Sequence, residues 1–266
     1  MAGPAQEATR TTDVLDLGDV RIARIREGQG RPIVLLPSLG RGQRDFDPVA
    51  PLLAAAGYRV LRPEPRGIGQ SRGPEVGVTL QALAGDVAAV IRAEAAGPAI
   101  VLGHAFGNWV ARTVAAAHPE QVRGVVLAAA AARVQSPEVR AALDICKDTT
   151  RTRDDRLAAL QFAFFAPGHD PTDWLEGWST DATRIQRAAT TASPREAWWH
   201  AGRAPILDLI AAHDPFRPPA TRQENADDFG GRVTVRLIDG ASHALIPEQP
   251  AAVAAAIDDW SRTLAP

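Results

Sequence analysis

The chain has 266 residues and a formal net charge of −2, from 29 lysines and arginines against 31 aspartates and glutamates. This length accommodates one large domain or two small ones, and the near-neutral charge offers no electrostatic argument for binding nucleic acid or an anionic membrane surface. The single cysteine, Cys146, excludes an internal disulfide and a cysteine-rich metal site.

Targeting segments are not evident in the sequence. Residues 1–12 are small and polar, without the apolar centre that a signal peptide contains. No apolar run reaches the roughly 18 residues that a membrane-spanning helix needs. Together with the single thiol, these observations lead us to expect a soluble cytoplasmic protein.

Strand and helix patterns alternate along the first half of the chain. Two strands, at 14–17 and 20–25, flank Gly18 and Asp19 and predict a hairpin. The continuous apolar run at 32–36 is typical of a strand buried on both faces. The elements expected next are a helix at 46–56, a strand at 58–61, a helix capped by Thr79 that runs to about 96, a strand at 99–102, a helix at 108–117 and a strand at 122–127. This alternation predicts a mostly parallel sheet with helices on both faces.

The pattern changes between residues 136 and 203, where strand-like runs disappear. This stretch holds four of the six tryptophans, and its expected helical pieces lie at 137–144, 154–165, 172–178, 181–190 and 194–200. Alternation then resumes with a strand at 206–211, a helix at 219–229, a strand at 233–238 and a helix at 249–263. We therefore predict an α/β core made of residues 1–135 and 204–266, interrupted by an all-helical cap or lid at 136–203.

The first motif with chemical content is Gly103-His104-Ala105-Phe106-Gly107, which lies between an expected strand and an expected helix. Glycines two residues either side of the apex allow a strand and a helix to approach closely while the apex residue takes a strained conformation. With serine at the apex, this pattern would be the G-x-S-x-G nucleophile elbow. Here the apex is Ala105, so the predicted turn lacks its nucleophile.

Two further residues complete a recognisable order. Asp214 follows the strand at 206–211, and His243 lies between the last strand and the last helix. The elbow comes first along the chain, the aspartate second and the histidine third. With this order the chain resembles the α/β-hydrolase superfamily over nearly its whole length, in particular its esterase- and lactonase-like members. The loop at 66–71 (RGIGQS) and the entry into the last helix at 247–250 (PEQP) are similar to the same superfamily.

This resemblance implies a role for each residue of the site. His243 would be the general base and acid, and Asp214 would orient it. The backbone N–H groups of Phe106 and Leu39 would stabilise an oxyanion, because both follow the strands that supply such donors in the superfamily. We read the rival candidates as structural: Asp208 lies within a strand, His213 lies on the wrong loop, and His104 and Cys146 lack suitable surroundings.

The substrate is expected to be a small molecule with an apolar part, because the helical stretch is rich in aromatic residues. Trp174, Trp178 and Phe165 are the candidates for contacts with it, although the same side chains could instead form the small core of that stretch. No metal ligand pattern appears, and the implied chemistry needs no organic cofactor. The sequence leaves the oligomeric state open.

Ala105 leaves three hypotheses open. In the first, the protein is an ester or lactone hydrolase that acts through a serine at this position, and the chain carries an inactivating alanine. In the second, alanine is natural, and the His243–Asp214 pair activates water or removes a proton from the substrate, giving a hydrolase without an acyl-enzyme, a lyase or an isomerase. In the third, the protein only binds a small molecule on a hydrolase scaffold.

Overall fold

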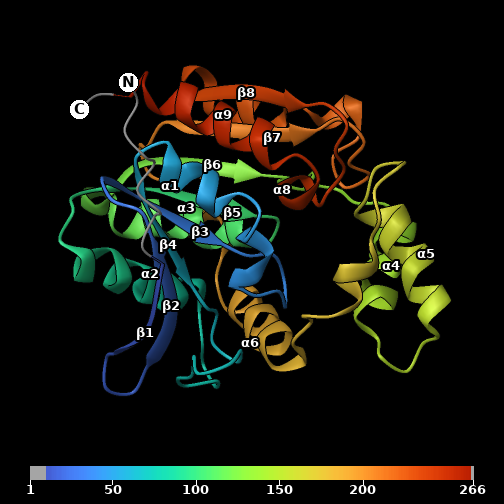
Figure 1. Cartoon of the computed structure of the whole chain (residues 1–266), viewed down its shortest axis with the longest axis horizontal. Coiled ribbons are helices and arrows are strands. Elements are labelled where there is room, and N and C mark those ends of the chain that lie inside the picture. The colour runs from blue at the N-terminus through green and yellow to red at the C-terminus, as the bar shows by residue number, and fades with distance from the viewer. Residues whose placement is uncertain (1–9, 265–266) are drawn as a thin grey trace, which may run out of the picture.

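A single mixed sheet forms the centre of the molecule. The computed structural model describes residues 10–264. Residues 1–9 and 265–266, which we assigned to the core, lie outside the described residues, and so does most of the polar segment at 1–12. The sheet has eight strands in the order β1-β2-β4-β3-β5-β6-β7-β8 (Figure 1). Its strands are β1 (Thr11–Asp16), β2 (Arg21–Glu27), β3 (Arg31–Leu36), β4 (Tyr58–Pro63), β5 (Ala99–His104), β6 (Val122–Ala128), β7 (Ile206–Ala211) and β8 (Val233–Ile238).

Strand direction divides this sheet into two parts. From β4 to β8 all neighbouring strands are parallel, whereas β1 pairs antiparallel with β2 and β2 pairs antiparallel with β4. The predicted hairpin is formed by β1 and β2, and the Leu17 N–H donates to the Val20 carbonyl oxygen at 2.8 Å. The α/β class and the mostly parallel sheet are therefore confirmed. Because parallel strands end at the same edge, the loops after β3, β5, β7 and β8 lie together there.

Helices cover both faces of the sheet (Figure 1). On one face, α2 (Leu80–Glu94) and α3 (Gly107–Ala117) bury apolar residues against the strands, and on the other face α1 (Ala50–Ala55) and α9 (Pro250–Ser261) do the same. The expected cap of α2 is present, since the Thr79 hydroxyl oxygen accepts from the Ala82 N–H at 3.1 Å. Among the described residues, no helix combines the length and apolar character needed to cross a membrane.

Several expected helices are shorter in the structure. The helix expected at 46–56 is a 3₁₀ turn, Gln43–Phe46, followed by α1, because Pro51 is well placed only in a first helical turn. The helix at 219–229 is likewise a 3₁₀ turn, Pro219–Thr221, followed by α7 (Glu224–Phe229). The segments at 172–178 and 194–200 form only the 3₁₀ turns Thr172–Leu175 and Arg195–Ala197.

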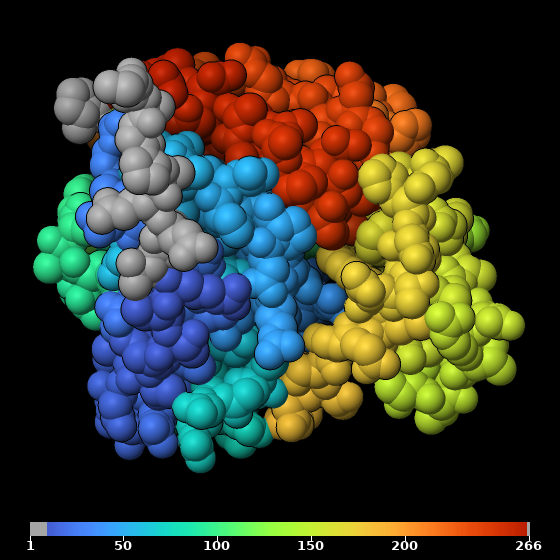
Figure 2. Space-filling model, viewed as in Figure 1, coloured from blue at the N-terminus to red at the C-terminus, as the bar shows by residue number. Residues whose placement is uncertain are grey.

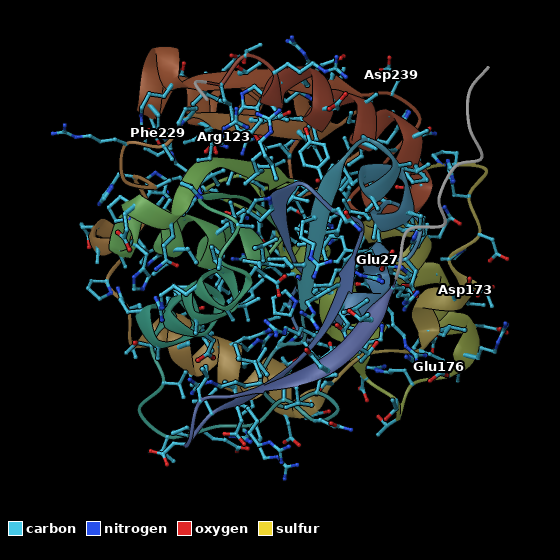
Figure 3. All side chains as sticks on the ribbon, turned by 60° about the vertical axis from the view of Figure 1, so that its left-hand side comes forward. Glu27, Arg123, Asp173, Glu176, Phe229 and Asp239 are labelled. Carbon is cyan, nitrogen blue, oxygen red and sulfur yellow. The ribbon has the colours of Figure 1, made fainter. Side chains whose placement is uncertain are left out.

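The stretch from 136 to 203 contains helices and 3₁₀ turns but no strand, and its parts pack differently. α4 (Pro137–Lys147), α5 (Arg153–Ala163) and the turn Thr172–Leu175 share one apolar cluster at the side of the molecule (Figure 2). Asp173 and Glu176 mark this part at the edge of the view in Figure 3. α6 (Thr180–Thr191) packs instead on the α2–α3 face through Ile185 and Ala189. The assignment of this stretch as a cap or lid stays a prediction.

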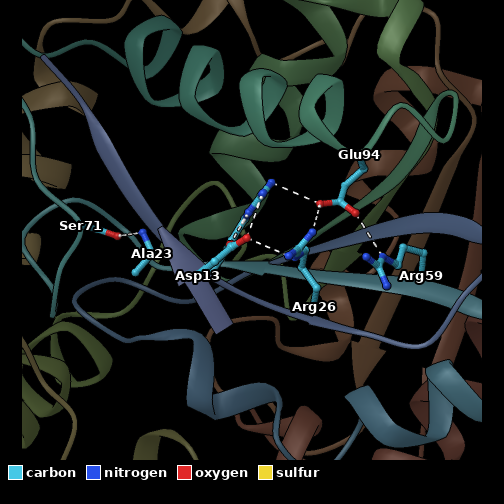
Figure 4. A network of polar contacts seen from close by, with 7 residues as sticks. Asp13, Ala23, Arg26, Arg59, Ser71 and Glu94 are labelled. Atoms are coloured by element: carbon cyan, nitrogen blue, oxygen red, sulfur yellow. Dashed lines mark hydrogen bonds and ion pairs between the residues drawn. The ribbon is translucent and has the colours of Figure 1, made fainter. Parts of the chain in front are cut away.

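A network of ion pairs fixes the N-terminal hairpin to α2 (Figure 4). Asp13 of β1 contacts Arg24 and Arg26 of β2, each at 2.7 Å. Glu94, at the end of α2, contacts the same two arginines at 3.2 and 3.5 Å and Arg59 of β4 at 3.1 Å. The Glu94 side chain is only 4% exposed, so its charge is strongly coupled to these three partners.

We predict that Glu94→Gln destabilises the fold. The amide of glutamine carries no negative charge and has one acceptor oxygen in place of two, so three guanidinium groups lose their shared anion, and the expected loss in free energy of unfolding is about 2–3 kcal/mol. The matched control is Glu75→Gln, because Glu75 pairs with Arg184 where both side chains are about half exposed. Urea unfolding should show a loss below about 1 kcal/mol for this control. Equal losses in the two variants would contradict the assignment.

Candidate active site

The turn between β5 and α3 has the geometry of a nucleophile elbow. Its apex, Ala105, has φ of 48°, a left-handed conformation that non-glycine residues rarely adopt. A Cβ atom added at Gly103 would lie closer than 3.0 Å to the backbone of Gly107, and one added at Gly107 would lie equally close to the Leu36 carbonyl oxygen. The two glycines are therefore required by the close approach of β5, α3 and β3.

Backbone hydrogen bonds fix the apex on both sides. The Ala105 N–H donates to the Ala128 carbonyl oxygen at 2.9 Å, and the Ala105 carbonyl oxygen accepts from the Asn108 N–H at 3.1 Å and from the Asn108 side-chain amide. The N–H groups of Phe106 and Leu39 have no acceptor among the described residues, and both residues line the same cavity. The structure thus brings the two expected oxyanion donors to one cavity.

His243 and Asp214 are directly paired. The Nδ1 atom of His243 lies 2.9 Å from Oδ2 of Asp214, and both side chains are buried. The other carboxylate oxygen of Asp214 accepts from the Phe216 N–H at 2.8 Å, which fixes the carboxylate within its loop. The Phe216 ring lies against the His243 ring, with 4.0 Å between the centroids. A neutral imidazole held in this way presents its second nitrogen as a base.

The rival candidates are placed elsewhere. Asp208 accepts at Oδ2 from Arg217 at 3.2 Å and from Asn225 at 2.7 Å, and its side chain is fully buried in β7. His213 is exposed. Cys146 lies in the apolar cluster of α4 and α5, where burial raises the pKa of its thiol to about 12, so it carries no thiolate at neutral pH.

His104 lies beside His243 in the interior. Its Nε2 atom lies 2.8 Å from the His243 carbonyl oxygen, and its Nδ1 atom has no hydrogen-bond partner among the described residues. Complete burial, together with the nearby His243, lowers the pKa of His104 to about 3. His104 is therefore neutral at ordinary pH and supports the backbone at His243 without placing a positive charge beside it.

A cavity of about 380 Å³ opens beside Ala105 and His243. Its walls are mainly apolar and include Leu39, Phe106, Trp109, Phe164 and Phe216.

The expected substrate contacts Trp174, Trp178 and Phe165 do not line this cavity. α5 ends at Ala163, and the next two side chains diverge. Both rings lie 5.4 Å from the Trp174 ring, but only the Phe164 ring also lies against His243, at 5.3 Å, and lines the cavity. The aromatic contact with the site therefore falls to Phe164, one position earlier than expected.

Comparison with known proteins now identifies the family. The sequence model of the alpha/beta hydrolase family matches residues 33–256. The chain belongs to this family. A putative non-heme bromoperoxidase of Mycobacterium tuberculosis is 29% identical over 88% of this chain and 95% of its own length, and a pyrethroid hydrolase of Sphingobium wenxiniae is 30% identical over 86% of each chain.

Solved structures show the same fold. A putative lipase of Acinetobacter baumannii superimposes with a TM-score of 0.79, over 95% of this chain and 91% of that chain, at 16% identity. The crystal structure of the mycobacterial bromoperoxidase superimposes with a TM-score of 0.73, over 99% of each chain, at 24% identity. At this level of identity the structural likeness concerns the fold alone.

Two loops of this alpha/beta hydrolase are held by the stretch at 136–203, through residues that sequence reasoning missed. The Gln186 side chain of α6 accepts from the Gly40 N–H at 2.7 Å, next to the oxyanion candidate Leu39. Glu248 accepts from the Ser242 N–H at 2.7 Å and from the Ala166 N–H at 2.6 Å. In the sequence, Glu248 could have been found because it lies in the PEQP segment at 247–250, whereas nothing marks Gln186.

A buried polar network lies behind the elbow. Asn108 accepts from Arg112 at 3.2 Å, and Arg112 donates to Asn225 at 2.8 Å. Asn225 in turn contacts Asp208, which pairs with Arg217, three residues after Asp214. Among the described residues, no group of three His, Cys, Asp or Glu side chains is arranged to hold a metal ion.

We predict that Gly107→Ala destabilises the protein, because the new methyl group would overlap the Leu36 carbonyl oxygen. The expected loss in free energy of unfolding is about 1–3 kcal/mol or more. Gly85→Ala is the control, since Gly85 lies within α2 with no atom near its added Cβ, and it should gain about 0.5–1 kcal/mol. Thermal unfolding measures both changes, and tolerance of alanine at 107 would refute the packing described here.

Because His104 is buried and neutral, we predict that it makes the folded protein less stable in acid. Between its usual pKa of 6.5 and about 3, the unfolded state binds a proton that the folded state does not. Unfolding free energy should therefore fall as pH falls through this window, by up to about 1.4 kcal/mol per pH unit from this group. His104→Gln retains a donor at the same place and should unfold with a shallower acid dependence. Parallel curves for the two proteins, measured by urea unfolding from pH 7 to pH 4, would count against a neutral His104.

Proposed function

We propose that this protein hydrolyses a carboxylic ester or a lactone of a small molecule, with the His243–Asp214 pair activating water directly. The observation that carries the proposal is the 2.9 Å contact between His243 Nδ1 and Asp214 Oδ2 at the wall of a cavity that also contains Ala105. Because alanine has no hydroxyl, an acyl-enzyme at position 105 cannot form. The base must then act on water.

The reaction can be written with the residues of the site alone. The second ring nitrogen of His243 takes a proton from water as the water oxygen attacks the carbonyl carbon. The negative charge that develops on the carbonyl oxygen is stabilised by the N–H groups of Leu39 and Phe106. The bond to the leaving oxygen then breaks, and His243 returns its proton to that oxygen. An ester gives an acid and an alcohol, and a lactone gives one hydroxy acid.

The cavity supports a substrate with an apolar part near the reacting carbonyl. Leu39, Phe106 and Phe216 surround the site of attack, and a volume of about 380 Å³ suits a small molecule. The similarity to a pyrethroid hydrolase supports hydrolysis as the reaction class.

A second candidate is an acyl-enzyme hydrolase whose active form carries serine at position 105. One observation favours it: Ala105 keeps the left-handed φ of 48° and the two crowded glycines of an elbow. This backbone conformation costs about 1–2 kcal/mol for a non-glycine residue. It holds residue 105 at the cavity, where alanine has no reactive group. Under this alternative the chain as it stands binds substrate without turning it over efficiently.

The experiment compares the unaltered protein with Ala105→Ser, His243→Ala and the control His213→Ala on simple aryl esters. Under the proposal, the unaltered protein is active and His243→Ala lowers kcat about 100-fold or more, because a general base is lost. His213→Ala should retain activity, since its side chain is exposed outside the site.

Labelling with a fluorophosphonate separates the alternatives. Burst kinetics and labelling in Ala105→Ser, with an inactive unaltered protein, would replace the proposal by the serine mechanism. Tight ligand binding without turnover in either form would indicate a binding protein. Undiminished activity in His243→Ala would reject the base assigned here.

A further inference from the structure

One permanently charged side chain lines the cavity of the candidate active site. Of the described residues that line the cavity, only Arg187, on α6, is an arginine, lysine, aspartate or glutamate. We propose that Arg187 binds an anionic group of the substrate, so that the substrate is an ester or lactone that also carries a carboxylate. This inference rests on the proposed function and specifies its substrate class.

The lining residues of the cavity differ in exposure. Its buried end holds His243, which is 3% exposed, with the buried polar residues Ser38 and Asn108 and with aromatic and aliphatic side chains. Its outer wall is polar: Gln135, Thr190 and Thr191 lie there, and the Arg187 side chain is 57% exposed. The hydroxyl groups of Thr190 and Thr191 donate to carbonyl oxygens of α6, so they offer no free donor to a substrate. A molecule that places its carbonyl at the buried end would therefore extend toward the Arg187 cation and the Gln135 amide. A carboxylate suits that position, because guanidinium groups bind carboxylates in a two-pronged geometry.

Arg187 can exchange its present partner, Asp144, for a substrate carboxylate with little loss of interaction energy. Arg187 lies 3.2 Å from Oδ1 of Asp144, and Lys147 lies 2.8 Å from the same oxygen. These three side chains carry a net charge of +1, so one positive charge is not balanced within the group. Asp144 would keep Lys147 if Arg187 turned to a substrate. The Arg187 and Asp144 side chains are both more than half exposed, and exposed ion pairs of this kind contribute little to stability because water screens them.

The same ion pair has a different interpretation. Because Asp144 belongs to α4 and Arg187 to α6, the pair also bridges two helices that border the cavity. If its role were to hold these helices together, removing either partner would have the same effect on every substrate. If Arg187 binds a carboxylate, the two removals have opposite effects on a carboxylate-bearing substrate. Variants of the two residues therefore distinguish the interpretations.

The kinetic test uses two esters of equal length, 4-nitrophenyl pentanoate and the mono-4-nitrophenyl ester of glutaric acid, which differ by a terminal carboxylate. Arg187→Gln should raise KM for the glutarate ester about twofold to fivefold more than for the pentanoate. Asp144→Asn should lower KM for the glutarate ester about twofold, because it frees the arginine. The control Arg184→Gln removes an exposed arginine one turn earlier on α6, outside the cavity lining, and should preserve the ratio of the two KM values.

Salt provides a second readout. The preference for the glutarate ester should weaken as ionic strength rises from about 0.01 to 1 M, since screening acts on exposed charges. The proposal would be overturned if Arg187→Gln changed KM equally for both esters. It would also be overturned if Asp144→Asn raised KM for the glutarate ester as much as Arg187→Gln does. Either result would leave the ion pair as a bridge between helices.

A binding measurement keeps this test independent of turnover. Trp109 lines the cavity, so its fluorescence can report binding of 5-amino-5-oxopentanoate and of neutral pentanamide. The unaltered protein should bind the carboxylate-bearing amide more tightly, and Arg187→Gln should abolish the difference. If no ester is hydrolysed but this difference is found, the proposed hydrolysis fails and the anion site stands. If esters are hydrolysed but the two amides bind equally in both proteins, the anion site fails alone.

Discussion

The arrangement of the site depends on the contact between two glycines and the backbone around them. Gly103 and Gly107 let β5, α3 and the end of β3 approach more closely than any side chain would permit. This approach holds Ala105 in its left-handed conformation and places Phe106 on the cavity wall. It also brings the loop after β3 close to the elbow, so that Leu39 lines the same cavity. Both expected oxyanion donors are therefore consequences of one steric constraint, and neither depends on the identity of the apex side chain.

The stretch at 136–203 contributes to this construction as well as bordering the cavity. Gln186 fixes Gly40 beside Leu39, and Glu248 joins Ser242, which precedes His243, to Ala166. Arg41 stacks on Trp174 at 4.3 Å and pairs with Asp45 at 2.7 Å, so the loop after β3 is also attached to the turn Thr172–Leu175. Movement of this stretch would therefore change the positions of the loop that carries Leu39 and of the loop that carries His243 together. Trp174 and Trp178, expected on the substrate side, lie against Arg41 instead.

The sequence predicts the structure best where a local pattern has only one steric solution. The glycine spacing at 103 and 107 predicts the elbow, and Thr79 predicts the start of α2, because each depends on neighbours within a few residues. Helix lengths near prolines, as at Pro51, were overestimated. Phe164 was missed in favour of Phe165 because the direction of each ring depends on the residue at which α5 ends. Gln186 could not be found, since its partner is 146 positions away and only the folded chain brings them together.

The proposed hydrolysis requires that a base and water replace the missing nucleophile. Intact-protein mass spectrometry of the unaltered protein, quenched during turnover of an aryl ester, tests this most directly. Direct attack by water gives product while the protein mass stays unchanged at every time point, whereas Ala105→Ser should accumulate an acyl adduct. Product formation that proceeds through an acyl adduct on the unaltered protein would contradict direct attack by water.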